Sequence, residues 1–140
     1  MREAEDAARP LNARGREEVQ RLATHLARLE VRVAEIRHSP KARAVETAAL
    51  IAKALGAPAR VAEGLLPEDD PTPMAAAVFR ETADLMLVGH LPHLDRLAAL
   101  LVLGDEARSI CALRTGGLLR LERDGGRWRL VWALAPGALP

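Results

Sequence analysis

Residues 39–48 of this chain read Ser39-Pro40-Lys41-Ala42-Arg43-Ala44-Val45-Glu46-Thr47-Ala48. The apolar residues of 31–38 before them predict a strand, Ser39 is suited to cap a helix, and Pro40 is suited to its first position. Arg43 then falls in the first helical turn, beside unpaired N–H groups and the positive end of the helix dipole. An anion binds favourably there, and a guanidinium offers it a two-pronged donor. The segment therefore predicts either a strand-to-helix anion site or an ordinary capped helix with a solvated arginine.

A second segment favours the anion site. Residues 85–90 read Leu-Met-Leu-Val-Gly-His, a continuous apolar run that is typical of a strand buried on both faces of a parallel sheet. His90 would stand at the carboxyl end of that strand, the edge at which open α/β sheets bind ligands. A lone histidine at such a position is commonly structural. Together with Arg43 after another strand, His90 becomes a candidate ligand of the same anion.

The rest of the chain alternates helical and extended patterns, which predicts an α/β fold. Residues 64–73, with three prolines, form the longest irregular stretch. The turn Asp124-Gly125-Gly126 predicts a late hairpin. The expected helices span about 15–29, 40–55, 73–82 and 93–103, and the expected strands lie near 31–38, before His90, and at 109–123 and 127–134.

Composition narrows the class of protein. A length of 140 residues predicts one domain over 1–140. The net charge of +1 argues against nucleic acid or an anionic membrane as the main partner. The apolar run 97–103 is far shorter than the roughly 20 residues of a membrane span. The charged amino terminus and the single Cys111 favour a cytoplasmic protein.

Four segments together resemble the histidine phosphatase superfamily, which is phosphoglycerate mutase-like, and within it the small phosphohistidine phosphatases of the SixA type. The resemblance runs from about residue 9 to residue 123. It is carried by Arg9-Pro10-Leu11-Asn12-Ala13-Arg14-Gly15, Ser39-Pro40-Lys41-Ala42-Arg43-Ala44 with Thr47-Ala48, Val88-Gly89-His90-Leu91-Pro92, and Leu113-Arg114-Thr115-Gly116-Gly117.

The resemblance implies a three-layer sandwich with a mostly parallel central sheet and a late antiparallel hairpin. It also implies phosphoryl transfer without a metal or cofactor: one histidine attacks phosphorus, while two arginines and a second histidine hold its oxygens. Arg43 and His90 match two members of that set as catalytic and phosphate-binding residues, and Arg2 matches a third in one alignment. The implied substrate is phosphohistidine in a protein, or a small phosphomonoester.

One departure from the family pattern concerns the nucleophile. The family opens with an apolar strand ending in Arg-His, whereas this chain opens Met1-Arg2-Glu3, so the first strand and the nucleophilic histidine are missing. Three functions stay open: a phosphatase with a misassigned or lost amino terminus, a non-catalytic phosphate-binding relative, or a metal-dependent hydrolase that uses His90, His93 and Asp95.

Overall fold

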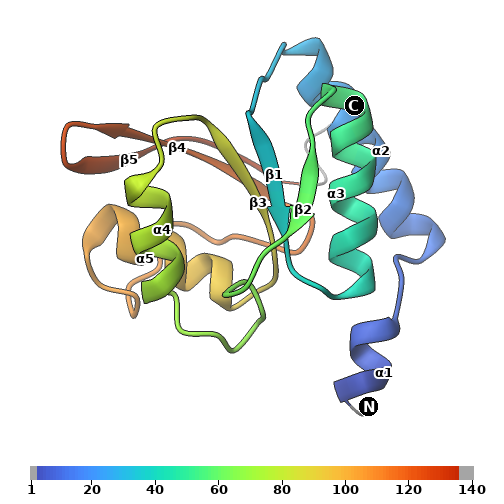
Figure 1. Cartoon of the computed structure of the whole chain (residues 1–140), viewed down its shortest axis with the longest axis horizontal. Helices are drawn as coiled ribbons and strands as arrows, with labels where there is room; N and C mark the ends of the chain where they lie inside the picture. The colour runs from blue at the N-terminus through green and yellow to red at the C-terminus, as the bar shows by residue number, and fades with distance from the viewer. Residues whose placement is uncertain (1–2, 136–140) are drawn as a thin grey trace. The chain divides into compact units, whose positions relative to one another are not determined.

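The computed structural model describes residues 3–135, which fall into two compact units (Figure 1). The first unit contains the residues up to Glu63 together with Thr82–Gly89, and the second contains Gly64–Glu81 and the residues from His90 onward. No helix within residues 3–135 has both the length and the apolar character that crossing a membrane requires.

The first unit is built on a parallel three-stranded sheet. Strands β1 (Glu35–His38), β2 (Ala59–Val61) and β3 (Leu85–Val88) lie in the order β2-β1-β3. In the central strand, Ile36 is opposite Ala59 on one side and Met86 on the other, and it is fully buried. All three strands point the same way, so their carboxyl ends share one edge of the sheet.

Three helices complete the first unit: α1 (Glu3–Ala8), α2 (Ala13–Arg28) and α3 (Ala42–Leu55). α3 contacts all three strands, and α2 packs beside α3 (Figure 1). Asn12 caps α2, because its side-chain oxygen accepts the Gly15 N–H at 2.7 Å. α3 ends at Gly56, whose φ of 67° suits a residue without a Cβ. α2 buries an apolar stripe at helical spacing, made of Val19, Leu22, Ala23 and Leu26.

The second unit joins two helices to a hairpin. α4 (Thr72–Arg80) packs against α5 (His93–Leu103), and α5 contacts the last strand. Strands β4 (Leu118–Asp124) and β5 (Arg127–Leu134) pair antiparallel. In β5 the exposure of the residues alternates along the strand, as period-two patterning requires.

The predicted fold class is confirmed: the chain is α/β, with a parallel sheet and a late antiparallel hairpin. Several details differ, and the strand expected near 31–38 begins only at Glu35. The helix α1 and the strand β2 were not expected. β2 has only three residues, all exposed, so it contains no apolar run that would predict a buried strand. The strand expected over 109–123 begins only at Leu118, because Gly117 closes a turn with its N–H on the Arg114 carbonyl oxygen at 2.8 Å. That residues 1–140 form one domain stays a prediction.

Candidate phosphate-binding site

Arg43 lies in the first turn of α3, directly after the carboxyl end of β1. The buried Ser39 leads the chain out of the sheet, and its N–H donates to the Val88 carbonyl oxygen at 3.1 Å. Two details of the sequence prediction are wrong. The helix begins at Ala42, so Pro40 is not its first residue and Lys41, not Ser39, is its N-cap. The Ser39 hydroxyl instead accepts the Lys41 N–H at 3.3 Å, which uses that oxygen in the turn before the helix.

The Arg43 guanidinium binds an anion from its own chain, the carboxylate of Asp6 in α1. Its Nη1 donates to the Asp6 carbonyl oxygen at 3.0 Å and lies 3.4 Å from Oδ1, and its Nη2 lies 3.3 Å from Oδ2. The Lys41 ammonium forms a short ion pair with the same Oδ2. The hydrogen bond from Lys41, with a further contribution from Arg43, lowers the pKa of Asp6 to about 2. Asp6 is therefore ionised at neutral pH.

The residues around Arg43 hold the start of α2 against α3. Glu46 accepts the Leu11 N–H at 3.0 Å on one carboxylate oxygen and forms a short ion pair with Arg16 through the other. The Thr47 hydroxyl donates to the Arg43 carbonyl oxygen at 2.7 Å. These contacts connect the two motifs at residues 9–15 and 39–48, because Glu46 of the second binds the backbone of the first.

His90 follows β3 after a single glycine, and its side chain is half-buried. Its carbonyl oxygen accepts the Leu94 N–H at 2.9 Å, at the start of α5. His90 therefore stands after the carboxyl end of β3, as the sequence predicted. His90 belongs to the second unit and Arg43 to the first.

The metal alternative required His90, His93 and Asp95 to lie together. Within residues 3–135, no three histidine, cysteine or acidic side chains are grouped so that they could hold a metal ion. The Asp95 carboxylate accepts the Ser109 hydroxyl at 3.1 Å. His93 is fully buried, and neither ring nitrogen has a hydrogen-bond partner in the described part of the chain. The metal-site interpretation is therefore wrong, because these side chains do not converge.

Burial lowers the pKa of His93 below its ordinary 6.5, and nearby Arg96 acts in the same direction. The carboxylates of Asp69 and Asp70 oppose the shift. Because burial is the larger effect, the neutral imidazole is favoured at neutral pH.

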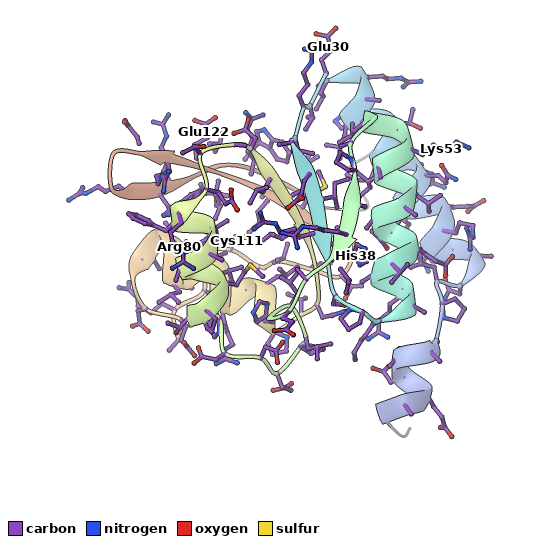
Figure 2. The ribbon with its side chains drawn as sticks, viewed as in Figure 1. Glu30, His38, Lys53, Arg80, Cys111 and Glu122 are labelled. Atoms are coloured by element: carbon purple, nitrogen blue, oxygen red, sulfur yellow. The ribbon has the colours of Figure 1, made fainter. Side chains whose placement is uncertain are left out.

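Two of the positions considered for the missing nucleophile motif, Arg2 and Glu3, lie at the start of the chain, and His38 is a further histidine at the sheet edge. Arg2 lies outside the described residues. Glu3 begins α1, so it does not end a strand. His38, labelled in Figure 2, is buried at the end of β1, and its Nδ1 lies 2.8 Å from the Ser39 carbonyl oxygen.

Sequence reasoning missed Lys41 and Asp6 as members of the site. Lys41 had a recognisable signal, because a cation immediately before the first turn of a helix is well placed to bind the same anion as that turn. Asp6 had none, because it is 35 residues from Lys41 in the sequence and is brought there only by the position of α1.

Comparison with known proteins identifies the family. The histidine phosphatase superfamily (branch 1) matches residues 4–66. An uncharacterised protein of Picosynechococcus sp. is 32% identical over 129 residues, covering 89% of this chain and 78% of the relative. The chain belongs to the histidine phosphatase superfamily, a family of phosphatases, which are hydrolases.

Within that superfamily the chain is similar to SixA. The structure of the protein histidine phosphatase SixA complexed with tungstate superimposes with a TM-score of 0.85 at 26% identity, covering 98% of this chain and 90% of that one. A proposed phosphohistidine phosphatase SixA from Agrobacterium tumefaciens matches with a TM-score of 0.77 at 26% identity, covering 94% and 86%. A third such structure, from Nakamurella multipartitia, shares the fold at 21% identity, a TM-score of 0.78 and coverage of 95% and 88%.

Proposed function

We propose that this chain is a phosphohydrolase of the SixA type that recognises phosphohistidine on a cytoplasmic protein through Arg43 and His90. The observation that carries the proposal is the state of Arg43. Its guanidinium lies in the first turn of α3, and both of its terminal nitrogens lie near an anionic carboxylate. A site that binds a carboxylate in this way has the charge and the donors to bind the oxygens of a phosphoryl group.

The similarity to SixA supports the chemical class of the ligand. Tungstate, which is bound in the SixA structure, is a tetrahedral oxyanion like phosphate. In this chain, Arg43 and His90 each follow the carboxyl end of a parallel strand, where ligands of α/β sheets bind. Fixed cationic donors at that position stabilise the charge that spreads over the phosphoryl oxygens in the transition state.

The reaction that we propose breaks the N–P bond of phosphohistidine. The phosphoryl group first passes to a histidine nucleophile, which frees the substrate histidine, and then to water, which releases inorganic phosphate. The nucleophile that the family resemblance implies has no counterpart in residues 1–140. The first histidine in this sequence is His25, and the residues that follow Met1-Arg2 form a helix, α1 (Glu3–Ala8), and not a strand that ends in Arg-His. This observation favours a second candidate, phosphohistidine binding without turnover by the 140-residue chain.

Binding of inorganic phosphate or tungstate, measured by isothermal titration calorimetry, tests the recognition half of the proposal. Arg43→Ala is expected to weaken binding by at least about tenfold, since charge-assisted hydrogen bonds contribute about 1.5–3 kcal/mol. His90→Ala is expected to weaken it to a smaller degree. The controls are Arg14→Ala, which changes a side chain that is 88% exposed, and His25→Ala on α2. Equal affinities in all five proteins, the parent included, would rule out this site.

Single-turnover labelling with a phosphohistidine protein separates the two candidates. A phosphatase releases phosphate and passes through a labelled histidine on this chain. A binding protein retains the phosphohistidine unchanged and protects it from other phosphatases. A small phosphomonoester, tested in parallel, decides whether recognition extends beyond phosphohistidine.

A further inference from the structure

The anion site at the start of α3 contains a second cation that the family resemblance does not assign. The Lys41 ammonium and the Arg43 guanidinium both reach Oδ2 of Asp6. One oxygen therefore joins two cations. Both side chains are largely shielded from solvent: the Lys41 side chain is 11% exposed and the Arg43 side chain is 24% exposed.

The enclosure of Lys41 is unusual for this residue type. Lysine side chains are almost never fully buried unless they are paired, because the ammonium is strongly hydrated. The chain has only one other lysine, Lys53, which is exposed near the carboxyl end of α3 (Figure 2). Lys41 is thus held in a position where an anion must compensate its charge.

The start of α3 provides no anion of its own. No side chain caps the helix, and its first turn has no acidic residue. Asp6 supplies the negative charge from a separate helix, where its side chain is 26% exposed. Arg9 adds a third, outer contact, with its Nη2 3.3 Å from Oδ1, but its side chain is 55% exposed. The inner contacts are those with Lys41 and Arg43.

We propose that Lys41 and Arg43 form one two-cation anion site, in which the Asp6 carboxylate is an internal ligand that an incoming phosphoryl group displaces. The proposal rests on the proposed function, and it adds Lys41 as a second phosphate-binding residue and Asp6 as a competitor. A phosphoryl group suits the same pair better than a carboxylate, because it carries up to about two negative charges and three acceptor oxygens.

Competition from Asp6 should weaken the apparent affinity for phosphate by an amount that can be measured. The apparent dissociation constant equals the intrinsic one divided by the fraction of molecules in which the site is open. If Asp6 occupies the pair in about nine-tenths of the molecules, its removal strengthens phosphate binding about tenfold. The pKa of about 2 keeps Asp6 ionised above pH 4, so the competition persists across the neutral range.

The experiment measures inorganic phosphate and tungstate binding by isothermal titration calorimetry in the full chain at fixed ionic strength. The two test variants are Asp6→Asn and Lys41→Met. Their matched controls are Glu5→Gln, an exposed acid on the same helix as Asp6, and Lys53→Met, an exposed lysine on the same helix as Arg43. Lys41→Arg tests whether a cation alone is required, and circular dichroism with thermal melting checks that each variant folds.

Asp6→Asn is expected to strengthen binding several-fold, and Lys41→Met to weaken it at least fivefold, with restoration by Lys41→Arg and no change in either control. The proposal is overturned if Lys41→Met binds as the parent does, or if Asp6→Asn leaves the affinity unchanged. If Lys41→Met does not fold, Asp6→Asn alone decides. Loss of binding in Arg43→Ala together with normal binding in Lys41→Met would reject this inference and leave the proposed function standing. Normal binding in Arg43→Ala would reject the proposed function itself.

Discussion

Replacing His93 by leucine should stabilise this protein, which is the reverse of the usual outcome at a fully buried position. Both ring nitrogens of His93 are buried and have no hydrogen-bond partner within residues 3–135. A buried polar group without a partner costs about 1–3 kcal/mol, and the change from an imidazole to an isobutyl shape costs up to about 1.5 kcal/mol. The free energy of unfolding at pH 7.5 is therefore expected to rise by about 1 kcal/mol, or roughly 3 °C in Tm.

The same substitution should change the pH dependence of stability. Burial lowers the folded-state pKa of His93 below 6.5, so the unfolded chain binds a proton more readily than the folded chain. In the parent, stability is full above pH 6.5 and falls as the pH drops below 6.5 toward the folded pKa. Leucine has no such group, so the advantage of His93→Leu should grow between pH 7.5 and pH 5.

Differential scanning calorimetry of the parent, His93→Leu and the control His25→Leu at several pH values checks both parts. His25 is half-exposed on α2, so its replacement should change stability by less than about 0.5 kcal/mol. A His93→Leu protein that melts below the parent at pH 7.5 would refute the reasoning about the unpartnered nitrogens. A Tm difference that stays constant from pH 7.5 to 5 would refute the reasoning about its pKa.

Three further predictions concern stability. The depressed pKa of Asp6 means that its stabilising effect is complete above pH 3.8 and is lost as pH falls through about 2, so Asp6→Asn should flatten the fall in Tm between pH 4 and pH 2. Ile36→Ala should cost about 2–5 kcal/mol in urea unfolding, because Ile36 is fully buried in the central strand, whereas Val61→Ala, at a side chain that is 56% exposed, should cost less than about 1 kcal/mol. Gly117→Ala should cost about 1–3 kcal/mol, because the added Cβ would lie 2.9 Å from a backbone carbonyl oxygen, while Gly126→Ala has open space and should be close to neutral by the same assay.

The elements with strong periodic patterns could be predicted from the sequence. The apolar stripe of α2, the continuous apolar run of β3 and the alternation in β5 each depend on local spacing, which a sequence displays directly. The weakly patterned elements could not. The three residues of β2 are exposed, and they form a strand because they pair with β1. That pairing joins segments that are distant in the sequence, so local spacing does not predict it.

The same distinction between local and long-range information applies to the residues of the candidate site. Arg43 and His90 were identifiable because each follows a strand pattern and begins or precedes a helix, and both features are local. The metal interpretation of His90, His93 and Asp95 failed because close spacing in sequence does not fix where side chains point: His93 is buried in the second unit, and the Asp95 carboxylate accepts a bond from Ser109.

The sequence by itself determined the α/β class, the family resemblance and the two residues on which the proposed function rests, because these depend on periodicity and on motif order. Only the tertiary structure decided what binds Arg43. The Asp6 carboxylate reaches Lys41 and Arg43 across 35 and 37 residues of chain, and the ion pairs form because α1 is placed beside the start of α3. Coulombic attraction acts through distance in space, and a contact of that kind leaves no periodic signal in the sequence.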